Sequence, residues 1–179
     1  MNWFYNLKIA TKLIAAFLAV LTLTAFIGIF AITQLAAVNK TATDIATNWM
    51  PSMQAAQAAR FYIAEYRLKE ARHILAKTHD ERSALERDAQ AAAKQVEERL
   101  TTYESLLSND EDRKLLDNLN EKWKAYQELS KNLLDMSRQE HEDDARSYFA
   151  TTTRQSFDAV NTSVQKLVEL NEKGASAAN

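Results

Sequence analysis

The stretch LIAAFLAVLTLTAFIGIFAI, residues 13–32, decides how this chain is organised. It lies within a longer segment, Leu13 to Asn39, that carries no ionisable side chain, and the sequence becomes charged and alanine-rich from Lys40 onward. At about 1.5 Å of rise per residue, a helix of this length reaches across the roughly 30 Å hydrocarbon core of a bilayer. We therefore predict one transmembrane helix over residues 13–35 and a water-soluble domain over residues 36–179.

The residues on either side of this helix give it a direction. Lys8 and Lys12 precede it without an acidic residue, whereas Asp44 lies soon after it. Because positive charge is retained on the cytoplasmic side, we place residues 1–12 in the cytoplasm as a short tip and the soluble domain outside. The aromatic residues 3–5 would lie at the inner membrane interface. A cleaved signal peptide is the alternative, but its apolar core of about 7 to 15 residues would be shorter than the one found here.

The composition of the soluble part argues against several classes of function. Pro51 and Gly174 are its only strong helix breakers, and the chain has no cysteine and a formal net charge of −2. A near-neutral chain without a dense basic cluster does not indicate nucleic-acid binding. Neither a glycine-rich phosphate loop nor a nucleophilic cysteine occurs, so the sequence does not point to an enzyme or to a bound cofactor. A metal site is not expected either, because the histidines are scattered: His73, His79 and His141.

Turn signals divide residues 36–179 into four helical segments. The signals are Thr78-His79-Asp80, Ser108-Asn109-Asp110 and the acidic residues 142–144, which are typical of helix starts. Apolar residues recur at spacings of three, four and seven within each segment, as on the buried face of an amphipathic helix. Pro51 is expected to bend the first helix or to mark where a stalk meets the bundle. The expected helices cover about 36–78, 80–108, 110–138 and 142–174.

These segments predict an all-α fold in which the transmembrane helix continues into an up-down-up-down antiparallel four-helix bundle. The fourth helix then returns to the membrane surface, so that residues 171–179 would lie where a second transmembrane helix begins. We expect the parent protein to continue into that helix, and a protein with a single span is the alternative.

The first helix of the bundle has two neighbouring stripes at heptad spacing. One is Ile45, Ser52, Ala59, Tyr66 and His73, and the other is Ala42, Trp49, Ala56 and Ile63. Together they are wider than one bundle face needs, and the alanines at 55, 56, 58 and 59 allow close approach of another helix. We therefore predict a weak homodimer formed through this helix.

Three arginines of the same helix are candidates for binding an anion. Arg60 and Arg72 have no acidic residue three or four positions away, whereas Arg67 has Glu70. A guanidinium without a local partner can bind a carboxylate through two hydrogen bonds. At 100° per residue, Arg72 is rotated by about 140° from Arg67, so one helix cannot aim all three at one ligand. A site across a dimer interface can use all three, and the alternative is that each is a surface residue paired with another helix.

Three short motifs resemble one family. They are Asn48-Trp49-Met50-Pro51, RLKEARHIL at residues 67–75, and Tyr-Phe-Ala-Thr-Thr-Thr at residues 148–153. With the cytoplasmic tip and single span, the chain resembles the amino-terminal part of a bacterial methyl-accepting chemotaxis receptor. The third motif is similar to a fourth-helix stretch of the enteric aspartate receptor, where Tyr, backbone carbonyls and a Thr hydroxyl meet the ammonium group of the ligand. The resemblance assigns these roles to Tyr148, Phe149, Thr151 and Thr153.

The resemblance implies a periplasmic sensor domain anchored in the inner membrane. It implies a homodimer that binds a small organic acid or an amino acid, directly or through a periplasmic binding protein, and signals through the fourth helix. The sequence also departs from the aspartate receptor, whose three arginines are spaced five and four apart, because Ala76 stands where the third would fall. Amino-acid specificity is therefore not implied. The alternatives are the sensor domain of a membrane histidine kinase or cyclase, and a membrane-anchored structural adaptor without a ligand.

Overall fold

The computed structural model describes residues 8–177, and the chain divides into two compact units after Thr43. The predicted aromatic residues 3–5 and most of the predicted cytoplasmic tip lie outside the described residues, as do residues 178–179. We describe each unit by itself.

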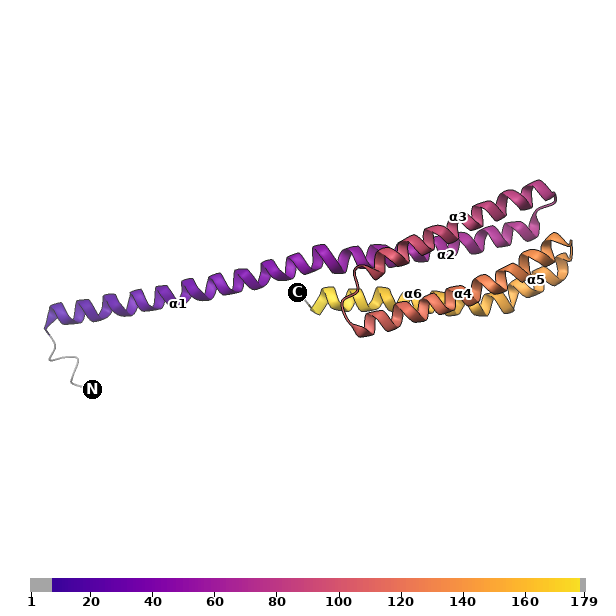
Figure 1. The fold of residues 1–179 in the computed structure, drawn as a ribbon. Coiled ribbons are helices and arrows are strands. Elements are labelled where there is room, and N and C mark those ends of the chain that lie inside the picture. Colours follow the sequence, from indigo (N-terminus) through magenta and orange to yellow (C-terminus); the bar gives the residue numbers. More distant parts are fainter. Residues whose placement is uncertain (1–7, 178–179) are drawn as a thin grey trace. The chain divides into compact units, whose positions relative to one another are not determined.

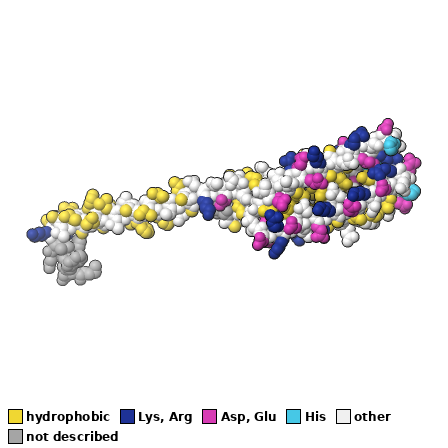
Figure 2. Space-filling view, in the orientation of Figure 1, with side chains coloured by type: hydrophobic (Ala, Val, Ile, Leu, Met, Phe, Trp, Pro, Cys, Tyr) yellow, Lys and Arg dark blue, Asp and Glu magenta, His cyan; other side chains and the backbone are white. Residues whose placement is uncertain are grey.

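The first unit is the helix α1 (Ile9–Asp44), which buries none of its residues. Hydrophobic side chains are spread along the helix (Figure 2), and its large ones, from Ile9 to Val38, are exposed. The hydroxyls of Thr22 and Thr24 donate to the carbonyls of Leu18 and Val20 within the helix, which satisfies these polar groups without water. By length and composition α1 could cross a membrane. The span over residues 13–35 stays a prediction.

The second unit is an antiparallel four-helix bundle. Its first helix starts as a short π-helix and its fourth is divided in two, and α2 packs on α3 while α4 packs on α5 and α6 (Figure 1). The elements are η1 (Ile45–Trp49), α2 (Met50–Leu75), α3 (His79–Glu104), α4 (Asp110–Arg138), α5 (Glu142–Ala150) and α6 (Thr152–Ala177). Strands are absent from residues 8–177, and η1 follows α1 directly in the chain. The predicted all-α bundle is confirmed.

The helix ends follow the expected turn chemistry with local differences. α2 ends at Leu75, three residues earlier than expected, because Ala76 is extended with ψ 136°. Thr78 then caps α3 through a reciprocal capping box with Glu81. At the start of α4, the side chain of Asn109 accepts a hydrogen bond from the backbone of Asp112.

The fourth helix is not the single helix expected over residues 142–174. It breaks at Thr151, whose backbone angles are φ −116° and ψ −81°. Three consecutive threonines begin at this residue, and β-branched side chains disfavour a helix. The hydroxyls of Thr151 and Thr153 donate to the carbonyls of Ser147 and Phe149, which compete with regular helical bonding.

Two helix breakers have specific positions at one end of the bundle. Pro51 is the second residue of α2, but it does not stand at a free helix start, because η1 directly precedes α2 and the backbone of Trp49 and Met50 is helical. The N–H that proline lacks is therefore missing from a continuous helical run, and the π-helix turn just before it is the local distortion that accompanies it. Gly174 lies inside α6, and a Cβ at this position would overlap the indole ring of Trp49. The glycine therefore allows the end of α6 to pack directly against η1.

The core runs along the bundle and confirms the apolar faces predicted for α3, α4 and the fourth helix. An aromatic group lies in its middle: Tyr66, Trp123, Tyr126 and Phe157. On α2, however, the stripes expected to form a dimer are largely buried within the subunit, including Ala56, Ala59 and Ile63 at 0% exposure. α2 contacts α3, α4, α5 and α6, and this number of neighbours explains its wide buried face. The predicted reason for dimerisation was therefore wrong.

Candidate functional site

The outward side of α2 has a second row of residues, which we call the outer seam. Its members recur at spacings of three and four and face solvent or are half-buried in the subunit. They are Gln54, Gln57, Phe61, Ala64, Leu68, Ala71 and Leu75. Phe61 is 58% exposed, Leu68 41% and Leu75 66%, which is unusual for large apolar side chains on one stripe. Heptad spacing of this kind is typical of a helix that packs against another helix.

The three candidate arginines flank the outer seam. Arg60 and Arg67 lie on one side of it and Arg72 on the other, as heptad geometry at 100° per residue requires. Arg60 and Arg72 are exposed, and neither has a hydrogen bond or ion pair within the described part of the chain. The three arginines therefore do not converge within one subunit. This is the arrangement expected from the rotation of about 140° between Arg67 and Arg72.

Arg67 is different because its guanidinium points into the bundle. Its Nη2 donates to the carbonyl oxygen of Phe149 at 3.1 Å, and its Nη1 lies 3.2 Å from the hydroxyl of Tyr126 and 3.4 Å from that of Thr153. The guanidinium carbon lies 4.0 Å from the ring centre of Phe149 and 4.7 Å from that of Phe157, at cation–π distance. One side chain of α2 thus connects α4, α5 and α6.

Arg67 meets the fourth helix at its break. The Phe149 carbonyl accepts hydrogen bonds from Arg67 and from the Thr153 hydroxyl, close to the break at Thr151. The Thr153 hydroxyl also lies within hydrogen-bond distance of Arg67. The resemblance assigned the Phe149 carbonyl and the Thr153 hydroxyl to the ammonium group of a ligand. In this structure the guanidinium of the same chain occupies them.

Tyr148 and Thr151 lie elsewhere. They line a hollow of about 330 Å³ between α4 and α5, together with Met136, His141 and Asp144. Tyr148 is half-buried and packs against the small core cluster of Ile74, Leu133 and Ala145. The structure therefore groups Phe149 and Thr153 with Arg67, but neither Tyr148 nor Thr151 has a hydrogen bond to that arginine among the described contacts.

Glu70 is a residue of this region that sequence reasoning missed. It is fully buried and accepts a short hydrogen bond from the hydroxyl of Tyr126, while its second oxygen has no protein partner. Burial raises the pKa of Glu70 to about 7, although the nearby hydroxyls of Ser130 and Tyr126 and the charge of Arg67 oppose the shift. The signal was present in the sequence, because Glu70 lies four residues after Tyr66 and three before His73, on the same buried stripe.

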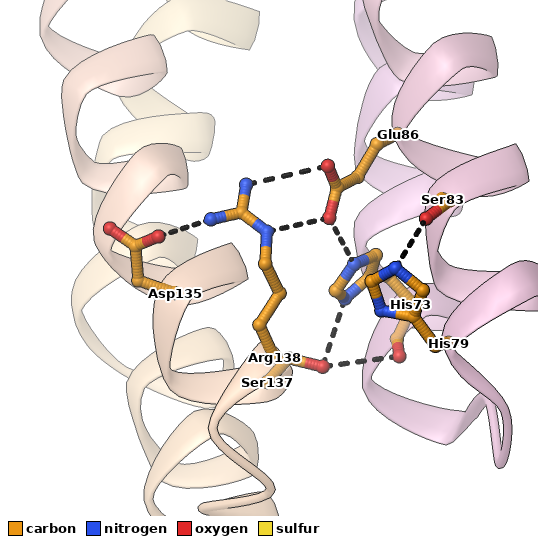
Figure 3. A network of polar contacts seen from close by, with 7 residues as sticks. All are labelled: His73, His79, Ser83, Glu86, Asp135, Ser137 and Arg138. Atoms are coloured by element: carbon orange, nitrogen blue, oxygen red, sulfur yellow. Dashed lines mark hydrogen bonds and ion pairs between the residues drawn. The ribbon is translucent and has the colours of Figure 1, made fainter.

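A second polar network connects the end of α2, the first half of α3 and the end of α4 (Figure 3). His73 is buried, with Nε2 2.9 Å from Glu86 Oε1 and Nδ1 2.9 Å from Ser137 Oγ. The Nε of Arg138 donates to the same Glu86 oxygen at 2.7 Å, and its Nη1 is paired with Asp135. Burial lowers the pKa of His73, and the nearby Glu86 carboxylate opposes that shift.

Both protonation states of His73 can be satisfied here. In the neutral ring Nε2–H donates to Glu86, and the hydroxyl of Ser137 donates to Nδ1. In the cation Nδ1–H donates to the Ser137 oxygen, and the hydroxyl turns to the His73 carbonyl, which lies 3.1 Å away. The network therefore holds the helices together in either state.

Comparisons with known proteins agree with this architecture. Residues 6–179 match the family described as a four-helix-bundle sensory module for signal transduction. YvaQ of Bacillus subtilis (strain 168), a protein named as a sensory transducer, is 20% identical over 173 residues, which are 97% of this chain and 30% of that protein. The chain thus spans about a third of the length of this relative. A periplasmic sensor domain of a sensor histidine kinase has a similar fold, with a TM-score of 0.63, 14% identity and coverage of 80% of this chain and 92% of that one.

Proposed function

The chain belongs to the family of four-helix-bundle sensory modules for signal transduction, and from this premise we propose that it is the periplasmic sensor region of an inner-membrane chemoreceptor. Its ligand would be a small organic anion bound where two copies of α2 meet. The name of the B. subtilis relative favours a transducer over a kinase or cyclase. The apolar α1 supplies a helix that could anchor the domain in the membrane.

The outer seam supports dimerisation through α2. A second copy would cover Phe61, Leu68 and Leu75, which the subunit itself leaves exposed. In a two-fold symmetric pair of parallel helices, Arg72 of one copy can approach Arg67 of the other, because they lie on opposite sides of the seam and five residues apart. Arg60 lies twelve residues from Arg72, about 18 Å along the helix axis, so it would meet a ligand only nearer the other end of the seam. Unpaired arginines at the edge of a helix interface are well suited to bind a carboxylate.

The arrangement around Arg67 carries the proposal. This arginine stands at the edge of the outer seam and also contacts the break of the fourth helix through the Phe149 carbonyl. An anion bound at the seam would compete for the guanidinium with Phe149, Tyr126 and Thr153. Ligand binding could thereby change the setting of α6 relative to α2.

The same contacts favour a plain organic acid over an amino acid. The Phe149 carbonyl and the Thr153 hydroxyl already hold the cation of Arg67, so a ligand ammonium group would have to displace it. At Arg60 and Arg72 a carboxylate has no such competitor, because neither guanidinium is paired within the described residues. Direct binding follows from this scheme, with delivery by a periplasmic binding protein as the alternative.

Signalling would use α6. Its buried stripe, Val160, Val164 and Leu167, packs into the core, and its end packs on η1 through Gly174. A ligand shifts such a helix only by binding one of two settings more tightly, and displacements of one or two ångströms are typical of this class of transition.

Calorimetric titration of the full chain in lipid nanodiscs tests the proposal, with succinate and L-aspartate as a pair that differs by the amino group. We expect succinate to bind at least as well as aspartate. Replacing the critical arginine among Arg60, Arg67 and Arg72 with Ala should cost roughly 2 to 5 kcal/mol of binding free energy, as for a desolvated charge that loses its partner. Arg154→Ala, on the exposed side of α6, is the control. Unchanged binding heats in all three variants would rule out the arginine site.

A further inference from the structure

A hollow of about 340 Å³ lies between α2 and α3, beside the outer seam. We call it the α2–α3 hollow. Two aromatic rings and three charged side chains line it, together with small side chains of α3. Its volume lies at the lower end of the roughly 300 to 1,000 Å³ that small-molecule sites occupy. The hollow therefore suits a compact ligand.

The two aromatic rings form a corner. Phe61 and Tyr62 meet edge to face, with ring centres 5.2 Å apart and an angle of 76° between their planes. Phe61 is exposed, and the half-buried Tyr62 has no hydrogen bond from its hydroxyl within residues 8–177. From α3, Ala91 and Ala92 leave space that larger side chains would fill. Exposed ring faces in such a corner can hold a cation.

The charged side chains leave the hollow negative. Among the described residues that line it, Glu65 and Asp88 are acidic and Lys69 is basic. The Nζ of Lys69 lies 3.5 Å from Asp88 Oδ2 and 3.9 Å from Glu65 Oε2, and neither carboxylate accepts a hydrogen bond within the described part of the chain. One ammonium group thus serves two carboxylates, and Asp88 is the nearer. The pairing of Glu65 is long and easily exchanged.

Glu65 stands between the aromatic corner and the lysine. It follows Phe61 and Tyr62 by four and three residues and precedes Lys69 by four, and these spacings place side chains next to one another on a helix. A cation on the rings would therefore meet Glu65 from the side opposite Lys69. The lysine would keep Asp88 as its partner.

We propose that the α2–α3 hollow binds a small organic cation, of the quaternary ammonium type, on the rings of Phe61 and Tyr62 with Glu65 as its counter-ion. Aromatic side chains recognise such cations through the negative charge of their ring faces. The site is complete in one subunit and uses none of the three candidate arginines. It therefore goes beyond the proposed function and does not depend on it.

Calorimetric titration of the full chain with choline tests this inference. Maltoside micelles are the medium, because phosphatidylcholine would itself present the ligand group. The control ligand is 3,3-dimethylbutan-1-ol, which has the shape of choline without the charge. We expect choline to bind and the alcohol to bind at least tenfold more weakly, because both the rings and the carboxylate require a cation.

Variants of the lining residues give effects of opposite sign. Tyr62→Leu and Glu65→Gln should each raise the Kd of choline at least fivefold, whereas Tyr62→Phe, which keeps the ring, should remain close to the parent. Lys69→Met should lower the Kd, because it removes the competitor for Glu65. Glu97→Gln removes the same charge from an exposed position of α3 that does not line the hollow, and it should have no effect.

Three results would overturn the inference. The first is equal affinity for choline and the alcohol, which would indicate apolar adsorption. The second is equal weakening by Glu65→Gln and Glu97→Gln, which would indicate general attraction to an acidic surface. The third is no binding at about 10 mM choline, well above a weak millimolar Kd, in both the parent and Leu68→Ser. The latter variant weakens the outer seam without adding charge, so that a second copy cannot hide Phe61. Succinate titrations of the arginine variants test the seam separately, and either site can fail without the other.

Discussion

The inner and outer faces of α2 have similar spacing but different surroundings. Ala59, Ile63 and Tyr66 recur at three and four residues and are buried by the other helices of the bundle. Phe61 and Leu68 recur with the same heptad period and are exposed. The comparison teaches that periodicity identifies a face that packs, but not whether its partner belongs to the same chain.

The largest expected effect comes from the inner face. Ile63→Ala removes a fully buried side chain, and we expect the free energy of unfolding to fall by about 2 to 5 kcal/mol. Phe61→Ala, two residues away on the outer face, should change it by less than about 0.5 kcal/mol in the monomer. Chemical denaturation in detergent micelles, followed by circular dichroism, measures both. Equal losses in the two variants would mean that the faces are not distinct.

A buried carboxyl on the inner face predicts a pH dependence. Glu70 holds its proton up to pH about 7 in the folded state, whereas the unfolded chain releases it near 4.5. The folded state therefore binds more protons between these values, and the free energy of unfolding should fall as pH rises from about 4.5 to about 7. The gap corresponds to at most about 3 kcal/mol. Denaturation at several pH values should show that Glu70→Gln removes this fall.

His73 acts in the opposite direction over part of the same range. Its pKa is lowered in the folded state by burial and by the charges of Arg138 and Arg82, with Glu86 opposing them. The unfolded chain binds the proton first as pH drops below about 6.5, so this residue makes the free energy of unfolding fall toward low pH. In Glu70→Gln the His73 effect should remain, and at lower pH it is joined by Glu81 and Glu86, whose pKa values are also lowered in the folded state. A variant with the same pH profile as the parent would contradict the role assigned to Glu70.

On the outer face, Leu68→Glu should weaken self-association. Two carboxylates would face each other at the seam of a dimer, and we expect the dimer Kd to rise at least tenfold, about 1.4 kcal/mol. Analytical ultracentrifugation in nanodiscs or micelles measures the change. The control is Lys124→Glu, which alters the charge of an exposed site on α4 and should leave the dimer Kd unchanged. Ala58→Glu is less suitable as a control because that position is half-buried. A parent that stays monomeric at high concentration with succinate present would remove the basis of this prediction.

Local chemistry made much of the fold predictable. The cap at Thr78, the asparagine at 109 and the acidic start of α5 are set by neighbouring residues, and the structure has them. The position of Arg67 could not be derived in this way, because its partners Phe149 and Thr153 lie more than 80 residues away. Sequence spacing favoured Arg60, which has no acid nearby, while the contacts of Arg67 depend on how three helices pack.

The smallest expected effect would strengthen the outer face. Gln57 occupies an apolar position of the seam, where a polar side chain lowers stability in exchange for a fixed register. Gln57→Leu should tighten the dimer by about 1 kcal/mol, near the value of one additional buried methylene group. The matched variant Gln155→Leu adds the same apolar surface on the exposed side of α6 and should leave the dimer Kd unchanged. Because the first variant gains association without touching the core, its unfolding at low concentration should match the parent. An equal decrease of the dimer Kd in both variants would indicate nonspecific association. It would contradict the prediction that the outer seam is the contact between the two copies.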